Sequence, residues 1–260
     1  MRFALQRLIA PFLALCLSAC GGGGSERPPT GSGSTWDYVA LGDSLAFGVG
    51  ANQAGYVPRY RDHIVADTGH QVELTNLGVP GWTSTDLFDA VRNEQRFRDA
   101  ISEAEVVTWD IGGNDMLAAR TRYLNGTCGG SDNQDCLRET VARFRTNWDG
   151  IMAEIKSLRS AGSTILRTMD IYNPFVAALK ASGDFDELKP YLEQVNAHIA
   201  QSAQANQVPV ARVYEAFNGP NGEADAAAKG YISNDLLHPD DDGYRAMGEL
   251  LRALGYGPLD

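Results

Sequence analysis

The sequence has few basic residues, few cysteines and no tract of like charge. Its 260 residues hold 22 lysines and arginines against 33 aspartates and glutamates, a formal net charge of −11. Because proteins bind nucleic-acid phosphates through Lys and Arg, this balance argues against a nucleic-acid partner. Hydrophobic residues make up 43% of the chain and charged residues 21%. That composition is typical of a globular domain and excludes a disordered chain or a coiled coil.

An apolar run near the N-terminus, from Leu8 to Leu17, is too short for a membrane span, which needs about 20 apolar residues. Arg2 and Arg7 precede the run and small residues follow it, a pattern typical of a secretory signal. The signal ends on Leu17-Ser18-Ala19-Cys20. This ending resembles the bacterial lipobox, in which the cysteine becomes the lipidated first residue of the mature chain.

The N-terminal features predict three segments. Residues 1–19 are expected to form a lipoprotein signal peptide, residues 20–35 a flexible Gly/Ser/Pro tether, and residues 36–260 the folded domain. Cys20 would then carry the lipid and anchor the protein to a membrane of the bacterial cell envelope. The domain would lie at the outer membrane, on its periplasmic side, or at the cell surface. The alternative is an ordinary signal in which Cys20 has no special role.

The remaining cysteines agree with export. Cys16 lies in the expected signal, which leaves Cys128 and Cys136 in the glycine-rich stretch from 127 to 135 and just after it. In an oxidising compartment a disulfide between these two residues is expected, and two free thiols are the alternative. A metal site is not favoured because no histidine or second cysteine pair lies nearby.

Short apolar runs alternate with segments of helical spacing along the rest of the chain. Strands are expected at residues 38–41, 72–77, 106–111, 164–169 and 208–213. Helices are expected at residues 56–67, 84–97, 137–158, 188–199 and 243–254. This alternation predicts an α/β fold with a parallel sheet covered on both faces. Sites in such sheets form at the carboxyl ends of the strands.

Candidate catalytic residues follow four of these expected strands. Ser44 comes after the first strand, Gly78 after the second, Asn114 after the third, and Asp235 and His238 after the fifth. Each one alone has an ordinary explanation, such as a helix cap or a turn. Their occurrence together, in this order and at one edge of the sheet, is much harder to explain in that way.

These motifs resemble the SGNH hydrolases, also called GDSL esterases/lipases. The name-giving residues correspond to Ser44, Gly78, Asn114 and His238, and the Asp-x-x-His-Pro block is present from Asp235 to Pro239. The resemblance covers Tyr38 to Leu254, and it implies a loop over residues 116–134, a region that varies freely in the family. It implies a three-layer α/β/α sandwich with a central five-stranded parallel sheet, similar to flavodoxin. The larger α/β-hydrolase fold is not favoured, because no Gly-x-Ser-x-Gly elbow surrounds Ser44.

The resemblance implies a serine esterase that works through an acyl-enzyme intermediate without a metal or organic cofactor. Ser44 would be the nucleophile, His238 the general base, and Asp235 the residue that orients and stabilises the imidazole. The oxyanion donors would be the Ser44 and Gly78 backbone amides and the Asn114 side chain. The expected substrates are small acyl esters or lysophospholipids, and the domain is expected to be a monomer.

Two alternatives remain open at this point. One is a carbohydrate acetylesterase that acts on acetylated glycans, because the family accommodates many esters on one scaffold. The other is a non-catalytic surface lipoprotein that binds envelope partners. Export and a tether would suit this binder equally well, but the complete set of motifs would be unexplained.

Several residues near the motifs are expected to be structural. We interpret Asp43 and Asp115 as carboxylates that bind loop backbone. The run Asp240-Asp241-Asp242 lacks the ligand spacing of a calcium loop and is expected to begin a helix at the solvent surface. Three aromatic residues could line an acyl pocket, but ordinary packing is the favoured reading for each: Trp82, Tyr172 and Phe175.

Overall fold

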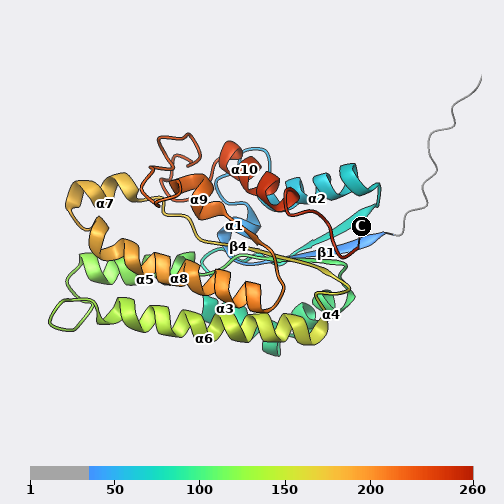
Figure 1. Ribbon diagram of the computed structural model, residues 1–260, viewed down its shortest axis with the longest axis horizontal. Coiled ribbons are helices and arrows are strands. Elements are labelled where there is room, and N and C mark those ends of the chain that lie inside the picture. The colour runs from blue at the N-terminus through green and yellow to red at the C-terminus, as the bar shows by residue number, and fades with distance from the viewer. Residues whose placement is uncertain (1–34, 260) are drawn as a thin grey trace, which may run out of the picture. The chain divides into compact units, whose positions relative to one another are not determined.

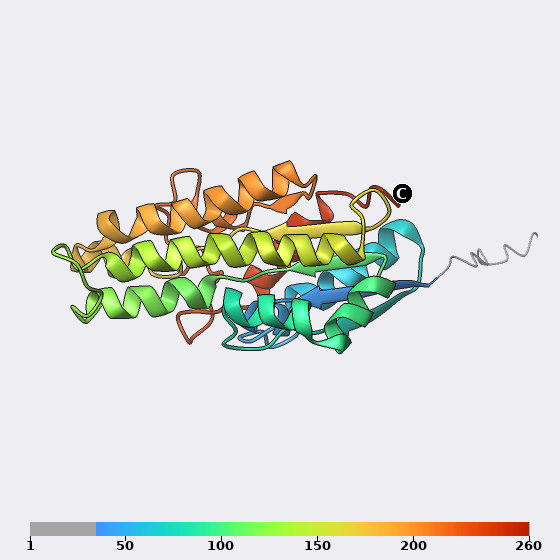
Figure 2. The ribbon, with the colours of Figure 1, turned by 90° about the horizontal axis from the view of Figure 1, so that it is seen from below.

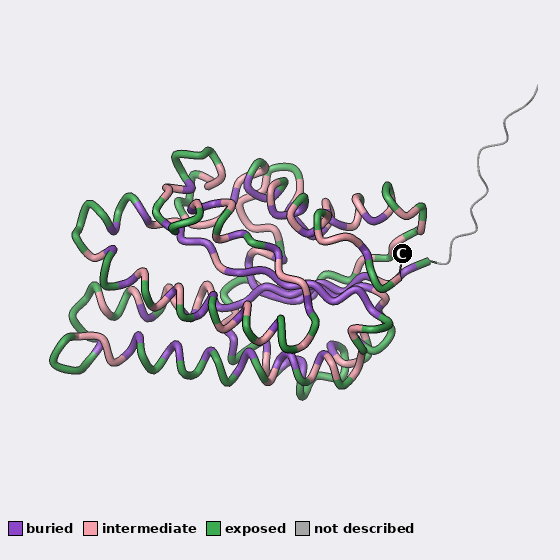
Figure 3. The backbone as a smooth tube through the Cα atoms, in the orientation of Figure 1, coloured by how far each residue is buried: buried purple, intermediate pink, exposed green. Residues whose placement is uncertain are grey.

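Five parallel strands form the centre of the protein in a computed structural model that describes residues 35–259 (Figure 1). The strands are β1 (Trp36–Leu41), β2 (Val72–Asn76), β3 (Val106–Trp109), β4 (Ile165–Met169) and β5 (Val210–Ala211), in the order β2-β1-β3-β4-β5. β3 and β4 are buried throughout, as Figure 3 shows, so most of their residues are apolar. β4 also buries Arg167 and Thr168. The expected five-stranded parallel sheet is confirmed.

The strand order reverses direction between β1 and β3. The chain passes from β1 outward to β2, and then returns to place β3 on the other side of β1. The register pairs Leu41 with Trp109, so the last residues of β1 and β3 lie side by side. An open α/β sheet forms its binding crevice at such a reversal, outside the carboxyl ends of the strands.

Ten helices accompany the sheet within residues 35–259. They are α1 (Ser44–Phe47), α2 (Tyr56–Thr68), α3 (Ser84–Asn93), α4 (Gln95–Glu103), α5 (Gly113–Leu124), α6 (Asp135–Leu158), α7 (Val176–Ser182), α8 (Phe185–Ala205), α9 (Val213–Asn218) and α10 (Asp241–Arg252). Alternate side chains of β1 face opposite layers, as a strand requires. Val39 and Leu41 pack with α3, α4, α6 and α8, whereas Tyr38 and Ala40 pack with α2, α9 and α10. The three-layer α/β/α architecture follows.

Helices α5, α6 and α8 run past the carboxyl ends of the strands and, with α7, enclose a third small core (Figures 1 and 2). Leu137 and Leu188 belong to this core, and a disulfide joins the buried Cys128 and Cys136 within it. The expected disulfide therefore lies in a helical extension beside the sheet edge that carries the sequence motifs.

The structure corrects several expected boundaries. The helix expected over 84–97 is two helices, because Glu94 has an extended backbone that redirects Phe97 and Ile101 to the core. The loop expected over 116–134 contains most of α5, whose apolar positions are too few to give a clear stripe. Three short helices were not expected from the pattern: α1, α7 and α9.

The expected signal peptide, the lipidation site Cys20 and nearly all of the expected tether lie outside the described residues. Of the helices in residues 35–259, none combines the length and apolar character that crossing a membrane requires.

Candidate active site

Ser44 lies where β1 gives way to the short helix α1. Gly42 and Asp43 form the connection, and the Asp43 carboxylate caps α1 by accepting a hydrogen bond of 2.9 Å from the Leu45 amide. Gly42 has a φ of +144°, and a Cβ atom there would lie 2.5 Å from the Asp110 carbonyl oxygen. Only glycine allows this close approach of the two strand ends. Ser44 is 8% exposed, so its hydroxyl is accessible from one side only.

Asp235 and His238 lie in the loop that leads from α9 to α10. Leu236, between them, has a φ of +61°, which folds the loop back on itself. Asp235 Oδ1 accepts hydrogen bonds from the backbone amides of Leu237 and His238 at 2.9 Å, and from Ser233 Oγ at 2.8 Å. These bonds fix the carboxylate so that its other oxygen, Oδ2, faces the imidazole of His238.

The three side chains form an unbroken chain of hydrogen bonds. His238 Nδ1 lies 2.6 Å from Asp235 Oδ2, and His238 Nε2 lies 2.9 Å from Ser44 Oγ. Burial raises the pKa of Asp235, but its hydrogen bonds from His238 and the loop amides outweigh burial and hold that pKa well below its ordinary value. The carboxylate is therefore ionised over the whole neutral range and can stabilise a positive charge on the ring.

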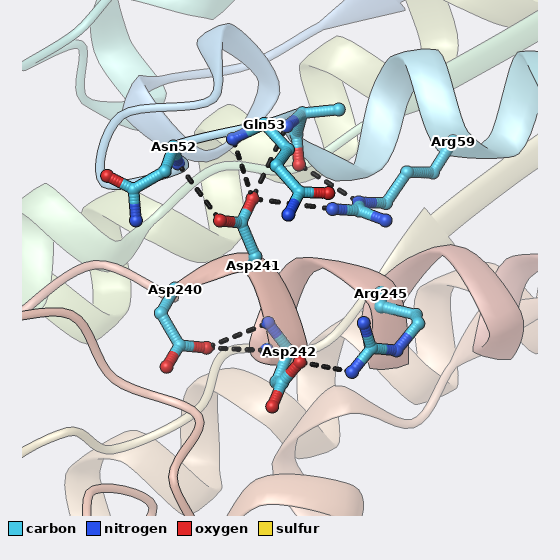
Figure 4. A network of polar contacts seen from close by, with 9 residues as sticks. Asn52, Gln53, Arg59, Asp240, Asp241, Asp242 and Arg245 are labelled. Atoms are coloured by element: carbon cyan, nitrogen blue, oxygen red, sulfur yellow. Dashed lines mark hydrogen bonds and ion pairs between the residues drawn. The ribbon is translucent and has the colours of Figure 1, made fainter.

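Hydrogen bonds at the start of helix α10, directly after the His238 loop, connect that loop to the segment that follows Ser44. Asp241 accepts a hydrogen bond of 2.9 Å from the Gln53 amide, and longer ones from Asn52 and Ala54 (Figure 4). Gly50 has a φ of +91°, and a Cβ atom there would lie 2.9 Å from His238 Cβ. The two segments are thus bonded together and packed backbone against backbone.

The three consecutive aspartates have separate structural roles. Asp240 caps α10 by accepting from the amides of Asp242 and Gly243, and Asp242 pairs with Arg245 (Figure 4). The expected helix start is confirmed, although Asp241 is bonded to a loop rather than facing solvent alone. Within residues 35–259, no group of three or more His, Cys, Asp or Glu side chains is arranged to hold a metal ion.

Asn114 lies on the first turn of α5, beside the Ser44 segment. Its Nδ2 donates to the Trp82 carbonyl at 2.8 Å and more weakly to Asp43 Oδ2 at 3.4 Å, and the residue lines the same cavity as Ser44 and His238. Gly78 differs, because its amide donates to Asn76 Oδ1 at 3.0 Å and the residue does not line this cavity. The structure therefore brings Asn114 to the site, while the Gly78 amide is engaged by a neighbouring side chain.

Asp43 and Asp110 form a buried carboxyl pair directly behind Ser44. The Asp43 amide donates to Asp110 Oδ1 at 3.4 Å, and the Tyr56 hydroxyl donates to Asp110 Oδ2 at 2.5 Å. Burial raises the pKa of Asp110 to about 6, and burial together with the Asp110 charge raises that of Asp43 well above its ordinary value. The two carboxyls therefore share a proton near neutral pH.

A largely apolar cavity opens beside Ser44 and His238 and continues between the helices of the extension. Leucines from four helices line it: Leu117 of α5, Leu137 of α6, Leu179 of α7, and Leu188 and Leu192 of α8. Tyr172 and Phe175 also line it, so the packing role expected for these two is incomplete. Trp82 packs as expected, with its ring stacked on Phe97.

The expected structural role of Asp115 is confirmed, because its carboxylate accepts hydrogen bonds from both the amide and the hydroxyl of Ser84 at 2.7 Å and so links α5 to α3.

Sequence reasoning missed Asp110, Gly50 and Asp241. Asp110 carried a usable signal, since it is an acidic residue directly after a buried strand. Gly50 and Asp241 gave none, because their roles depend on contacts between segments almost two hundred residues apart.

Comparison with known proteins identifies the family of this chain. Residues 40–246 match the GDSL-like Lipase/Acylhydrolase family. The spore germination lipase LipC of Bacillus licheniformis is 30% identical over 230 residues, which cover 87% of this chain and 99% of that protein. The solved lipase Lip_vut3 from a goat rumen metagenome is 28% identical, with a TM-score of 0.73 over 86% of this chain and all of that one.

A further solved structure is similar in fold alone. Axe2, an acetylxylan esterase from Geobacillus stearothermophilus, is 19% identical, with a TM-score of 0.62 over 86% of this chain and 95% of that one. The family match spans most of the chain, and the matched residues run from β1 to α10. The chain therefore belongs to the GDSL-like lipase/acylhydrolase family and is a carboxylic ester hydrolase.

Proposed function

We propose that Ser44, His238 and Asp235 form the catalytic triad of a serine esterase that acts on acyl esters. The observation that carries this proposal is the continuous chain of hydrogen bonds from Ser44 Oγ through both ring nitrogens of His238 to Asp235. A serine hydroxyl is a weak nucleophile until a neighbouring base takes its proton. The chain supplies that base, together with a carboxylate that selects the tautomer in which Nε2 is free to accept.

The reaction then proceeds in two halves. In the first, Ser44 Oγ attacks the ester carbonyl carbon while His238 Nε2 takes the hydroxyl proton. The tetrahedral intermediate collapses, the ester C–O bond breaks, and His238 returns the proton to the leaving alcohol. In the second half, water loses a proton to His238 and attacks the acyl-serine. The acid product leaves and Ser44 recovers its proton.

Negative charge on the carbonyl oxygen requires donors on the side of Ser44 away from His238. We assign this role to the Ser44 amide and the Asn114 side chain, which both adjoin the cavity. The Gly78 amide is the third expected donor. It can take part only when the Asn76 side chain that now accepts its hydrogen bond is displaced by the substrate oxygen.

The cavity supports an acyl chain longer than acetyl as the preferred substrate group. Its leucine-rich walls extend from Ser44 into the helical extension, and burying methylene groups there is favourable by about 0.8 kcal/mol each. Three large apolar side chains are strongly exposed within residues 35–259, and two of them adjoin site residues: Phe47 at the end of α1, and Leu236 between Asp235 and His238. Small acyl esters and lysophospholipids suit these features better than acetylated sugars.

Hydrolysis of p-nitrophenyl esters of increasing chain length tests the proposal. We expect kcat/KM to rise from acetate to medium-chain esters, and Ser44→Ala to lower turnover by a factor on the order of 10⁶. Ser157→Ala is a matched control, because that exposed hydroxyl bonds only to its own helix. Acetate as the best substrate would contradict the acyl preference, and full activity in Ser44→Ala would contradict the triad.

We also propose that residues 1–19 are a signal peptide and that Cys20 carries a lipid anchor, with residues 20–35 as the tether to the domain from residue 36. The support is the sequence pattern alone. Growth of the producing bacterium with a labelled fatty acid tests it. We expect label on the wild-type protein and none on Cys20→Ser, and equal labelling of the two would overturn the anchor.

A further inference from the structure

Arg120 is a cation in the wall of the otherwise apolar cavity. Asn114, Leu117 and Arg120 follow one another at intervals of three residues along α5, and all three line the cavity. Residues at this spacing share one face of a helix. At a rise of 1.5 Å per residue, Arg120 lies about 9 Å along the helix axis from Asn114, which adjoins Ser44.

The guanidinium of Arg120 has no carboxylate partner. Within the described part of the chain, it forms no hydrogen bond or ion pair, and its Nε is buried without an acceptor. The guanidinium lies over the face of the Phe175 ring, whose centroid is 4.0 Å away. Burial lowers the pKa of Arg120, and the more distant charge of Asp184 partly offsets this effect. A guanidinium carries five donors, so most of its binding capacity is unused.

A second unused donor lines the same cavity. Asn173 is only 7% exposed, and its Oδ1 accepts from the Phe175 amide at 2.9 Å. Its Nδ2 has no acceptor anywhere in residues 35–259. This nitrogen is not among the fully buried side-chain atoms that lack a partner, so it reaches open space and is free to donate to a ligand.

The carboxyl groups in the cavity wall are already engaged. Asp170 accepts from the Tyr214 amide at 2.7 Å and pairs with Arg212 at 3.3 Å, whereas Asp43 and Asp110 bond to each other. None of them neutralises Arg120. The cavity therefore combines apolar walls and Ser44 with an unpaired positive charge.

We infer that the enzyme prefers esters that carry an anionic group remote from the scissile carbonyl, and that Arg120 binds this group. The inference rests on the proposed function, because it places the ester at Ser44. The shared chemistry is a carboxylate or phosphate oxygen that accepts from the guanidinium. The group could belong to the far end of the acyl chain or to the alcohol that leaves.

Paired substrates separate these two sources. The first arm compares p-nitrophenyl hydrogen esters of dicarboxylic acids, from succinate to suberate, with p-nitrophenyl alkanoates of equal carbon number. The second arm compares 1-acylglycerol 3-phosphate with 1-acylglycerol. The measured quantity in both arms is the ratio of kcat/KM for the anionic ester to that for its neutral partner.

We expect Arg120→Gln to lower this ratio by about 10- to 100-fold in one arm, the loss typical of a charge-assisted hydrogen bond. Arg120→Lys should retain an intermediate ratio, since it keeps the charge but not the planar fork. Arg122→Gln is the matched control, because Arg122 lies on the same helix, is exposed and does not line the cavity. Equal ratios for Arg120→Gln and Arg122→Gln in both arms would overturn the inference.

A binding measurement distinguishes this failure from failure of the triad. Calorimetric titration of Ser44→Ala with the suberate monoester requires no chemistry at Ser44. We expect measurable heat of binding for Ser44→Ala and at least a tenfold weaker affinity when Arg120→Gln is added. Binding that is insensitive to Arg120 would overturn the inference even if Ser44 proves to be the nucleophile.

Discussion

The Asp241 carboxylate accepts a hydrogen bond from the Gln53 amide at 2.9 Å, so the helix that follows His238 holds the loop that follows Ser44. Two further amides of this loop donate to the same carboxylate, and Arg59 pairs with it (Figure 4). This single side chain therefore links two distant segments of the chain at the point where the proposed nucleophile and base lie side by side.

Replacing Asp241 with alanine should lower kcat while leaving the surface charge little changed. We expect about 1 to 3 kcal/mol less stability from the lost amide partners, and a fall of about tenfold in kcat as the distance between Ser44 and His238 becomes less well defined. Asp242→Ala is the matched control, because Asp242 pairs only with Arg245 on its own helix. Urea unfolding and ester turnover measure the two effects. Equal losses in the two variants would contradict the role of Asp241.

Asn114→Ala should remove one oxyanion donor. We expect kcat to fall by about 10²- to 10³-fold with little change in KM, because the donor acts mainly on charge that develops in the transition state. Asn125→Ala, at the exposed end of the same helix, provides the comparison. A loss for Asn114→Ala below about threefold would show that the amide serves only its bond to the Trp82 carbonyl.

The buried pair of Asp43 and Asp110 predicts how stability depends on pH. The folded protein holds a proton on Asp110 up to about pH 6, whereas an unfolded aspartate releases it near pH 4. Because the folded state then binds more protons, the free energy of unfolding should fall as pH rises through this range, by roughly 3 kcal/mol from Asp110 alone. Asp110→Asn should remove this contribution, whereas burial still raises the pKa of Asp43.

Unfolding in urea at a series of pH values measures the effect. Asp89→Asn is the control, because it makes the same chemical change at an exposed position. The wild-type protein and Asp89→Asn should lose stability in parallel between pH 4 and 7, while Asp110→Asn should lose clearly less. Parallel curves for all three proteins would show that Asp110 is ionised throughout this range in the folded state.

The strands of the sheet, and the sequence motifs that follow them along the chain, were predictable because both depend on local sequence patterns. β3 and β4 are buried on both faces, so most of their residues are apolar, although β4 also contains Arg167 and Thr168. Helix α6 follows a regular apolar stripe over seven turns and was predicted almost to its ends. Strand β5 has only two residues, because the chain turns into α9 at Val213, and no local pattern marks that turn.

The site was predictable only as a set of residues. The motifs identified Ser44, Asn114, Asp235 and His238, which the fold brings to one edge of the sheet. The environment of these residues depends on distant contacts: Asp110 against Asp43, and Gly50 against His238. Helix α5 was missed as well, and with it the face on which Arg120 extends the site.

Labelling with a fluorophosphonate tests the central claim most directly, because the reagent forms a covalent bond only with a serine whose neighbouring base activates it. Intact mass spectrometry should show one adduct per molecule, and peptide mapping should place it on Ser44. Ser44→Ala should give no adduct, and His238→Ala should react far more slowly. A folded wild-type protein that stays unlabelled, or an adduct on another serine, would contradict the account.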